Sequence, residues 1–143
     1  MSLVSIPQLK EITDLRLPFA RPYCFDVMRL AHLEAVVRLP ADEAFLRPGG
    51  TIAGPAMMAL ADYALYAAVL ASIGPVELAV TTSLNINFLR KPLPGDLVAE
   101  TRLIKLGKRL AVGDVCIHSD KSEDMVAHAT GTYSIPPRID TAS

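Results

Sequence analysis

Asp62 is the only formally charged residue between Arg47 and Glu77, and apolar side chains dominate the segment around it. A carboxylate that leaves water must replace its solvation with hydrogen bonds or opposite charges. Asp62 is therefore either a structural acid with a partner, such as strand backbone, Tyr63 or Tyr66, or an acid kept for chemistry. In the second case it would act as a general base or as a nucleophile.

The segment that carries Asp62 is predicted to be a long helix. Pro55 suits the first helical turn, where its missing N–H costs no hydrogen bond, and Gly74-Pro75 is a stop signal. Alanine is abundant between these points and β-branched residues are few, which favours a helix. Because nearly every face of this helix is apolar, we expect protein to surround it on most sides.

Strands are predicted around this helix, because the hydrophobic period changes to two from residue 80 onward. Strict alternation places Thr81 on the polar face of its strand, together with Ser83, Asn85 and Asn87. The expected elements are a short helix over 7–17 and strands over 32–39, 80–89, 97–106, 109–119 and 124–135.

One long apolar helix is best covered by a curved sheet, and consecutive strands with short links pair in antiparallel fashion. That architecture, in the α+β class, is the hotdog fold. We therefore predict a single hotdog domain over residues 1–143. Its core is expected at about 32–135, with an N-terminal extension over 1–24 and a loose tail over 136–143.

The composition indicates one globular domain. The chain has 143 residues, 51% of them hydrophobic and 20% charged, with a formal net charge of -1. This balance predicts no nucleic-acid partner, and the apolar content favours an oligomer. Cys24 and Cys116 do not make a disulfide framework. No signal peptide is recognisable, and Pro55 and Asp62 argue against a membrane span over 52–73, so we expect a cytoplasmic protein with no membrane partner.

Two stretches of the sequence carry a family resemblance. The first, Pro48-Gly-Gly-Thr-Ile-Ala-Gly-Pro, is followed after six residues by Asp62. The second, Val80-Thr-Thr-Ser-Leu-Asn-Ile-Asn-Phe-Leu-Arg-Lys-Pro, is followed by Gly95-Asp96. In their order and spacing the two stretches resemble the PaaI-like hotdog acyl-CoA thioesterases, and the resemblance runs from about residue 32 to residue 135.

The resemblance implies hydrolysis of an acyl-CoA thioester by water, with no metal and no cofactor beyond the CoA of the substrate. By position, Asp62 matches the family's catalytic acid and Gly54 the glycine whose backbone N–H polarises the thioester carbonyl. Thr81 matches a hydroxyl residue that helps to position the attacking water. Two helical turns, roughly 12 Å of rise, separate Gly54 from Asp62. As in the family, we expect Gly54 of one chain to meet Asp62 of another chain at the interface of a homodimer or homotetramer.

Cations at strand ends and turns are expected to meet the CoA phosphates, as such residues do in the family. Arg47 falls where related enzymes often have Asn. We single out Arg47, Arg90, Lys91, Lys108 and Arg109 as substrate-binding residues, although ordinary solvated charge explains any single one of them more simply. The three histidines, His32, His118 and His128, lack metal-ligand spacing.

One departure from the family pattern keeps other functions open. The family usually has His-Gly-Gly where this chain has Ala53-Gly54-Pro55, and Pro55 has no N–H to donate. A non-catalytic acyl-CoA-binding protein is therefore the main alternative to an enzyme. A hotdog enoyl-CoA hydratase would pair an Asp with a His early in this segment, which here contains no His. A plain structural dimer is the remaining alternative.

Overall fold

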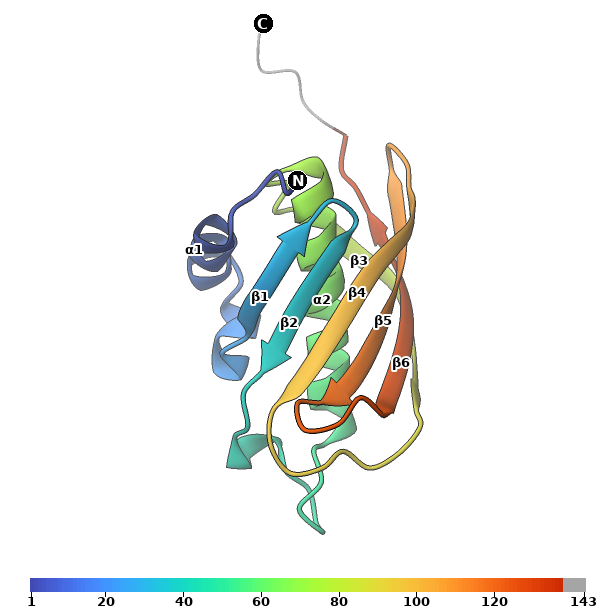
Figure 1. Ribbon diagram of the computed structural model, residues 1–143. Helices are drawn as coiled ribbons and strands as arrows, with labels where there is room; N and C mark the ends of the chain where they lie inside the picture. The colour runs from blue at the N-terminus through green and yellow to red at the C-terminus, as the bar shows by residue number, and fades with distance from the viewer. Residues whose placement is uncertain (138–143) are drawn as a thin grey trace, which may run out of the picture.

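Six antiparallel strands form one curved sheet in the computed structural model, which describes residues 1–137. The strands are β1 (Asp26–Ala31), β2 (Glu34–Leu39), β3 (Val80–Phe88), β4 (Leu97–Leu106), β5 (Leu110–Ser119) and β6 (Met125–Ser134). Their order across the sheet is β1-β2-β4-β5-β6-β3. Figure 1 shows the sheet curving along one long helix, α2 (Gly54–Ile73). The predicted hotdog fold is confirmed, and residues 138–143 of the expected tail lie outside the described residues.

Helix α2 forms the centre of the core. It is long and apolar enough to cross a membrane, but 83% of its 18-residue apolar window is buried, as in the core helix of a soluble protein. Leu65 of α2 faces Gly113 and Gly131, which pair with each other across β5 and β6. A Cβ at Gly131 would lie 2.5 Å from Leu65 Cδ1, and one at Gly113 would lie 2.8 Å from Leu65 Cδ2. The two glycines therefore let the helix approach the sheet closely.

Two features of the sheet differ from the sequence-based expectation. The sequence does not predict β1, whose alternation is broken by an irregularity in register between Val27 and Arg29. The sequence also suggests that strands joined in the chain are neighbours, whereas β3 pairs with β6 at the edge of the sheet. Residues 89–96 run past the end of the sheet to reach β4 (Figure 1). Link length alone therefore does not give the strand order.

The N-terminal segment packs beside α2 (Figure 1). Helix α1 (Ile6–Arg16) begins with a capping box formed by Ser5 and Gln8, and the 3-10 helix η1 (Pro18–Tyr23) follows it. The Thr13 hydroxyl of α1 lies 2.7 Å from the Tyr63 hydroxyl of α2. A second 3-10 helix, η2 (Glu43–Phe45), lies between β2 and α2.

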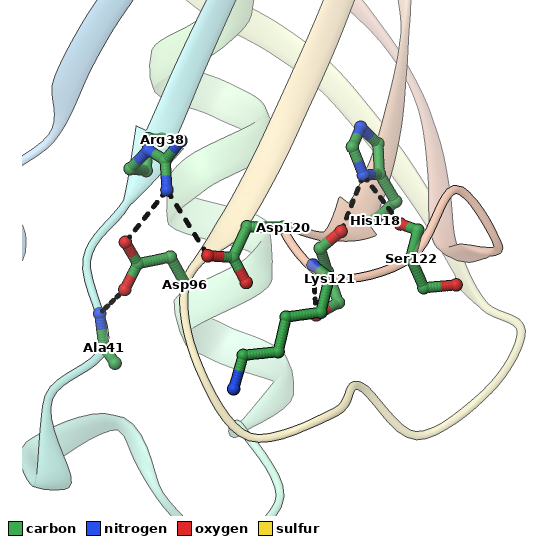
Figure 2. Close-up of polar contacts among 8 residues, drawn as sticks. Arg38, Ala41, Asp96, His118, Asp120, Lys121 and Ser122 are labelled. Atoms are coloured by element: carbon green, nitrogen blue, oxygen red, sulfur yellow. Dashed lines mark hydrogen bonds and ion pairs between the residues drawn. The ribbon is translucent and has the colours of Figure 1, made fainter.

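An ion-pair cluster ties three connections together at one end of the sheet (Figure 2). Arg38 Nη1, near the end of β2, lies 3.1 Å from Asp96 Oδ2 and 3.5 Å from Asp120 Oδ2. The Ala41 N–H donates to Asp96 Oδ1 at 2.8 Å. This backbone hydrogen bond, together with the Arg38 guanidinium, holds the pKa of Asp96 below its usual range. Asp96 of the Gly95-Asp96 pair therefore anchors the connection into β4.

Candidate active site

Three elements meet at the Asp62 carboxylate. The Thr81 hydroxyl of β3 donates to Asp62 Oδ1 at 2.5 Å, and the Tyr133 hydroxyl of β6 donates to the same oxygen at 2.7 Å. The Tyr133 hydroxyl also lies 2.9 Å from the Asp62 backbone carbonyl oxygen. Within residues 1–137 no hydrogen bond reaches Asp62 Oδ2. One carboxylate oxygen is thus fixed by two donors while the other is free to take a proton.

A β-bulge directs Thr81 toward Asp62. The pairing of β3 with β6 shifts between Thr81, opposite Tyr133, and Ser83, opposite Thr132. This shift places Thr81 on the half-buried side of the strand, whereas Ser83 is exposed. The expectation that Thr81 shares a polar face with Ser83 is therefore wrong, because one extra residue inverts the alternation at that point.

Tyr133 keeps its proton over the whole ordinary pH range. The side chain is buried, and this burial, followed by the negative charge of Asp62, raises the pKa of Tyr133 well above its usual value. A phenol that stays neutral remains a hydrogen-bond donor to the carboxylate. The sequence does not predict Tyr133 as a site residue, since only the β3–β6 register brings it beside Thr81.

The carboxylate faces a cavity, the Asp62 chamber, of about 180 Å³. Its lining is Leu17, Phe19, Ala20, Phe25, Ala59, Asp62, Tyr63, Tyr66, Glu77, Ala79, Val80, Thr81 and Tyr133. Burial, with the charge of Glu77, raises the pKa of Tyr66 to about 12. Burial likewise raises the pKa of Tyr63. The chamber is therefore lined mainly by apolar and neutral aromatic groups, with Asp62 and Glu77 as its two acids.

Gly54 opens onto a different cavity of the chain, the Gly54 groove, of about 650 Å³. Arg47, Arg90 and Lys91 also line this groove, so four of the predicted site residues lie around one hollow. Among the described residues the Gly54 N–H has no hydrogen-bond partner, as expected for the first turn of a helix. A Cβ at Gly54 would lie 3.2 Å from the Phe88 ring, so glycine also fits the tight packing there.

Lys108 and Arg109 lie elsewhere. They line a third cavity, of about 480 Å³, together with Ile73 at the C-terminal end of α2. Gly54 begins the same helix, so about 28 Å of helix separates the two ends. Within one chain these two cations are thus remote from Gly54. Ser134 pairs with both Leu110 and Val80, so Arg109 lies only two strands away from the end of β3 that carries Thr81. The substrate-binding role of both cations stays a prediction. Within residues 1–137 no three His, Cys, Asp or Glu side chains gather closely enough to hold a metal ion.

Comparison with known families identifies the superfamily of the chain. A sequence model described as the thioesterase superfamily matches residues 49–126, which is more than half of the chain. The chain belongs to the thioesterase superfamily. The matched range contains Gly54, Asp62 and Thr81, but it ends before Tyr133 and begins after the N-terminal segment.

Several relatives of this superfamily member have known sequences or structures. A presumed thioesterase from Silicibacter sp. TM1040 is 45% identical, with a TM-score of 0.86 over 96% of this chain and 95% of that one. The phenylacetic acid degradation protein PaaI from Thermus thermophilus, in a mutant form, is 31% identical, with a TM-score of 0.73 over 83% of this chain and 99% of that one. A presumed esterase from Pseudomonas aeruginosa is 36% identical over 74% of this chain and 78% of its own length. The chain is thus a PaaI-like hotdog thioesterase by family, and these relatives support a hydrolase activity in general.

Proposed function

We propose that the protein hydrolyses acyl-CoA thioesters, with Asp62 as the general base that activates water. The observation that carries this proposal is a carboxylate held by Thr81 and Tyr133 through one oxygen, with its other oxygen free, beside a mainly apolar cavity. Asp62 Oδ2 would take a proton from water, and the resulting hydroxide would attack the thioester carbonyl carbon. Collapse of the tetrahedral intermediate would then break the carbon–sulfur bond, and the leaving CoA thiolate would take the proton from Asp62.

The oxyanion of that intermediate requires a hydrogen-bond donor, and Gly54, the predicted donor, does not line the Asp62 chamber of its own chain. Gly54 offers a free N–H at the positive end of the α2 dipole, in a groove separate from the Asp62 chamber. We therefore infer that Gly54 of one copy serves Asp62 of another, in a homodimer or a homotetramer. The open edge of β3, where Val80 and Phe88 are exposed, supports such an assembly, because exposed apolar edge strands pair readily.

We propose that the CoA moiety binds in the Gly54 groove. Arg47, Arg90 and Lys91 line it, and all three side chains are exposed enough to reach phosphate groups in solvent. Arg90 also pairs with Asp124 at 3.3 Å, and this exposed pair would exchange easily for a phosphate. The thioester would then extend from the groove of one copy toward the Asp62 chamber of the next.

The test is release of free CoA thiol from a panel of acyl-CoA esters. Asp62→Ala is expected to lower kcat about 10²- to 10⁴-fold, the usual contribution of a general base. Asp26→Ala, at an exposed acid of β1, serves as the matched control and should keep wild-type activity. An absence of turnover across the whole panel would contradict the proposal.

A second candidate is a protein that binds acyl-CoA without hydrolysing it. It is favoured by the Ala53-Gly54-Pro55 turn, in which Ala53 provides no side-chain cap and Pro55 no N–H. Calorimetry with acyl-CoA, run beside the turnover assay, separates the two functions. Binding without thiol release would select this candidate.

A further inference from the structure

One wall of the Asp62 chamber comes from the N-terminal segment, not from the helix and strands that hold the carboxylate. Leu17, Phe19, Ala20 and Phe25 contribute this wall. All four precede residue 49, where the match to the thioesterase superfamily begins. This wall of the chamber is therefore built outside the matched region.

This wall is fixed in place by contacts on both sides. Ala20 is only 4% exposed, and its N–H donates to the Leu17 carbonyl at 3.0 Å. The Phe25 ring stacks on Tyr63 of α2, with ring centroids 4.5 Å apart and planes 11° from parallel. Upstream, the Thr13–Tyr63 hydroxyl contact joins α1 to α2. Phe19 is 68% exposed, so the wall limits the space beside Asp62 on the side formed by Leu17, Ala20 and Phe25.

The size and charge of the chamber indicate what fits. A closed apolar cavity of about 150 Å³ accommodates benzene. The half-open chamber, of about 180 Å³, would hold about six to eight carbon atoms before a longer acyl group has to extend past its mouth. Glu77 lines the chamber as well as Asp62. Glu77 is paired with Arg16 at 2.8 Å, whereas no ion pair among the described residues offsets the charge of Asp62. Asp62 therefore disfavours an acyl group that carries a second carboxylate, because like charges repel in a mainly apolar space.

We propose that the N-terminal segment makes the enzyme selective for short, uncharged acyl groups, with Leu17 and Ala20 as the residues that determine acyl length. This inference rests on the proposed thioesterase function. Leu17 is half-buried at the wall, so shortening it to alanine deepens the chamber. Ala20 is buried there, so lengthening it to leucine fills the chamber.

The experiment measures kcat/KM on acyl-CoA esters from acetyl to palmitoyl, with adipoyl-CoA beside hexanoyl-CoA as a charged partner of equal length. In the wild type, kcat/KM should fall at least about tenfold between octanoyl and dodecanoyl, and adipoyl should be at least about tenfold poorer than hexanoyl. Leu17→Ala should move the length limit upward, and Ala20→Leu should move it downward. Leu15→Ala makes the same change as Leu17→Ala at a 67% exposed position that does not line the chamber, and should leave the profile unchanged.

The outcomes separate the inference from the function on which it rests. Hydrolysis of palmitoyl-CoA as fast as hexanoyl-CoA, or a profile that neither variant moves, would overturn the length limit and leave the thioesterase function intact. If no ester is hydrolysed, the proposed function fails, and calorimetry with non-hydrolysable alkyl-CoA thioethers of the same lengths still tests the chamber. A length cut-off in binding that shifts with Leu17→Ala supports the inference, and binding that is independent of length overturns it.

Discussion

At the scale of single residues, the Asp62 carboxylate is oriented by two hydroxyl groups from two strands. Tyr133→Phe keeps the ring and removes one of these donors. We expect kcat to fall by about tenfold to a hundredfold with little change in KM, because the carboxylate loses its orientation and the substrate contacts are kept. Steady-state kinetics on the best acyl-CoA ester would measure kcat and KM separately.

The matched control for this change is Tyr23→Phe, which removes a phenol hydroxyl in the same aromatic cluster but outside the Asp62 chamber. It should leave both constants near the wild-type values. Equal losses in the two variants, or a change confined to KM, would contradict an orienting role for Tyr133.

The buried tyrosines also predict how stability depends on pH. The pKa of Tyr66 is raised to about 12 and that of Tyr133 is raised further, while unfolded tyrosines titrate near 10. A raised folded-state pKa contributes stability that is complete below the unfolded value and is lost as pH rises toward the folded value. Stability should therefore decline above about pH 10, and Tyr133→Phe should decline less steeply, as measured by urea unfolding at pH 8 to 11. Parallel declines would contradict this prediction.

The sequence predicted this site in part. Asp62 stands out because its carboxylate interrupts an apolar helix, and Thr81 follows from the strand motif. Tyr133 lies 71 positions from Asp62, and its role depends on a register that local patterns do not encode. The bulge after Thr81 is equally invisible to strict alternation.

At the scale of elements, two glycines of the sheet allow helix α2 to pack closely against it. Gly131→Ala would place a Cβ 2.5 Å from Leu65 Cδ1, and Gly113→Ala would place one 3.0 Å from the Arg102 backbone carbonyl as well as close to Leu65. We expect each to lower the free energy of unfolding by about 1–3 kcal/mol, as overpacking typically does. Gly113→Ala should lower the free energy of unfolding more than Gly131→Ala does, because the backbone can shift less than a leucine side chain can.

Chemical denaturation would measure these changes. Gly107→Ala is the control, because its Cβ would meet only the Leu110 carbonyl at an ordinary 3.5 Å. Leu65→Ala combined with Gly131→Ala should recover part of the overpacking loss. If Gly113→Ala were as stable as Gly107→Ala, the close packing of α2 against Gly113 would be contradicted.

The connections at the end of the sheet are held by charge. Asp96→Ala removes both the Ala41 hydrogen bond and the Arg38 pair, and we expect the free energy of unfolding to fall by about 1 kcal/mol at pH 7 for this half-buried group. Because the folded pKa of Asp96 is lowered, this contribution is present above its unfolded pKa and is lost as pH falls through the folded value. Asp120→Ala, which loses only a 3.5 Å ion pair, should cost less. Thermal unfolding at pH 7 and pH 3 would measure both.

At the scale of the whole molecule, the predicted site residues fall into separate places on one chain. The sequence predicted α2 and most of the strands, because their hydrophobic periods are local. It did not indicate that Lys108 and Arg109 would lie near the opposite end of α2 from Gly54, since that placement depends on how β4 and β5 cross the helix. The separation of the Gly54 groove from the Asp62 chamber supports a site shared between copies.

Subunit mixing tests that shared site. Gly54→Pro removes the N–H at a helical position where proline is tolerated, and Asp62→Ala removes the base, so each pure variant should lose at least about a hundredfold in kcat. If Gly54 of one copy serves Asp62 of the other, a two-fold symmetric dimer containing one copy of each variant has one intact site and one doubly damaged site. Unfolding and refolding an equal mixture should then restore roughly a quarter of wild-type activity, since about half of the dimers are mixed.

Gly54→Ala, which keeps the N–H, replaces Gly54→Pro in the control mixture and should be active by itself. A mixture that stays as inactive as its components would place Gly54 and Asp62 in independent roles, and the oxyanion donor would then have to be sought among the groups that line the Asp62 chamber of a single chain.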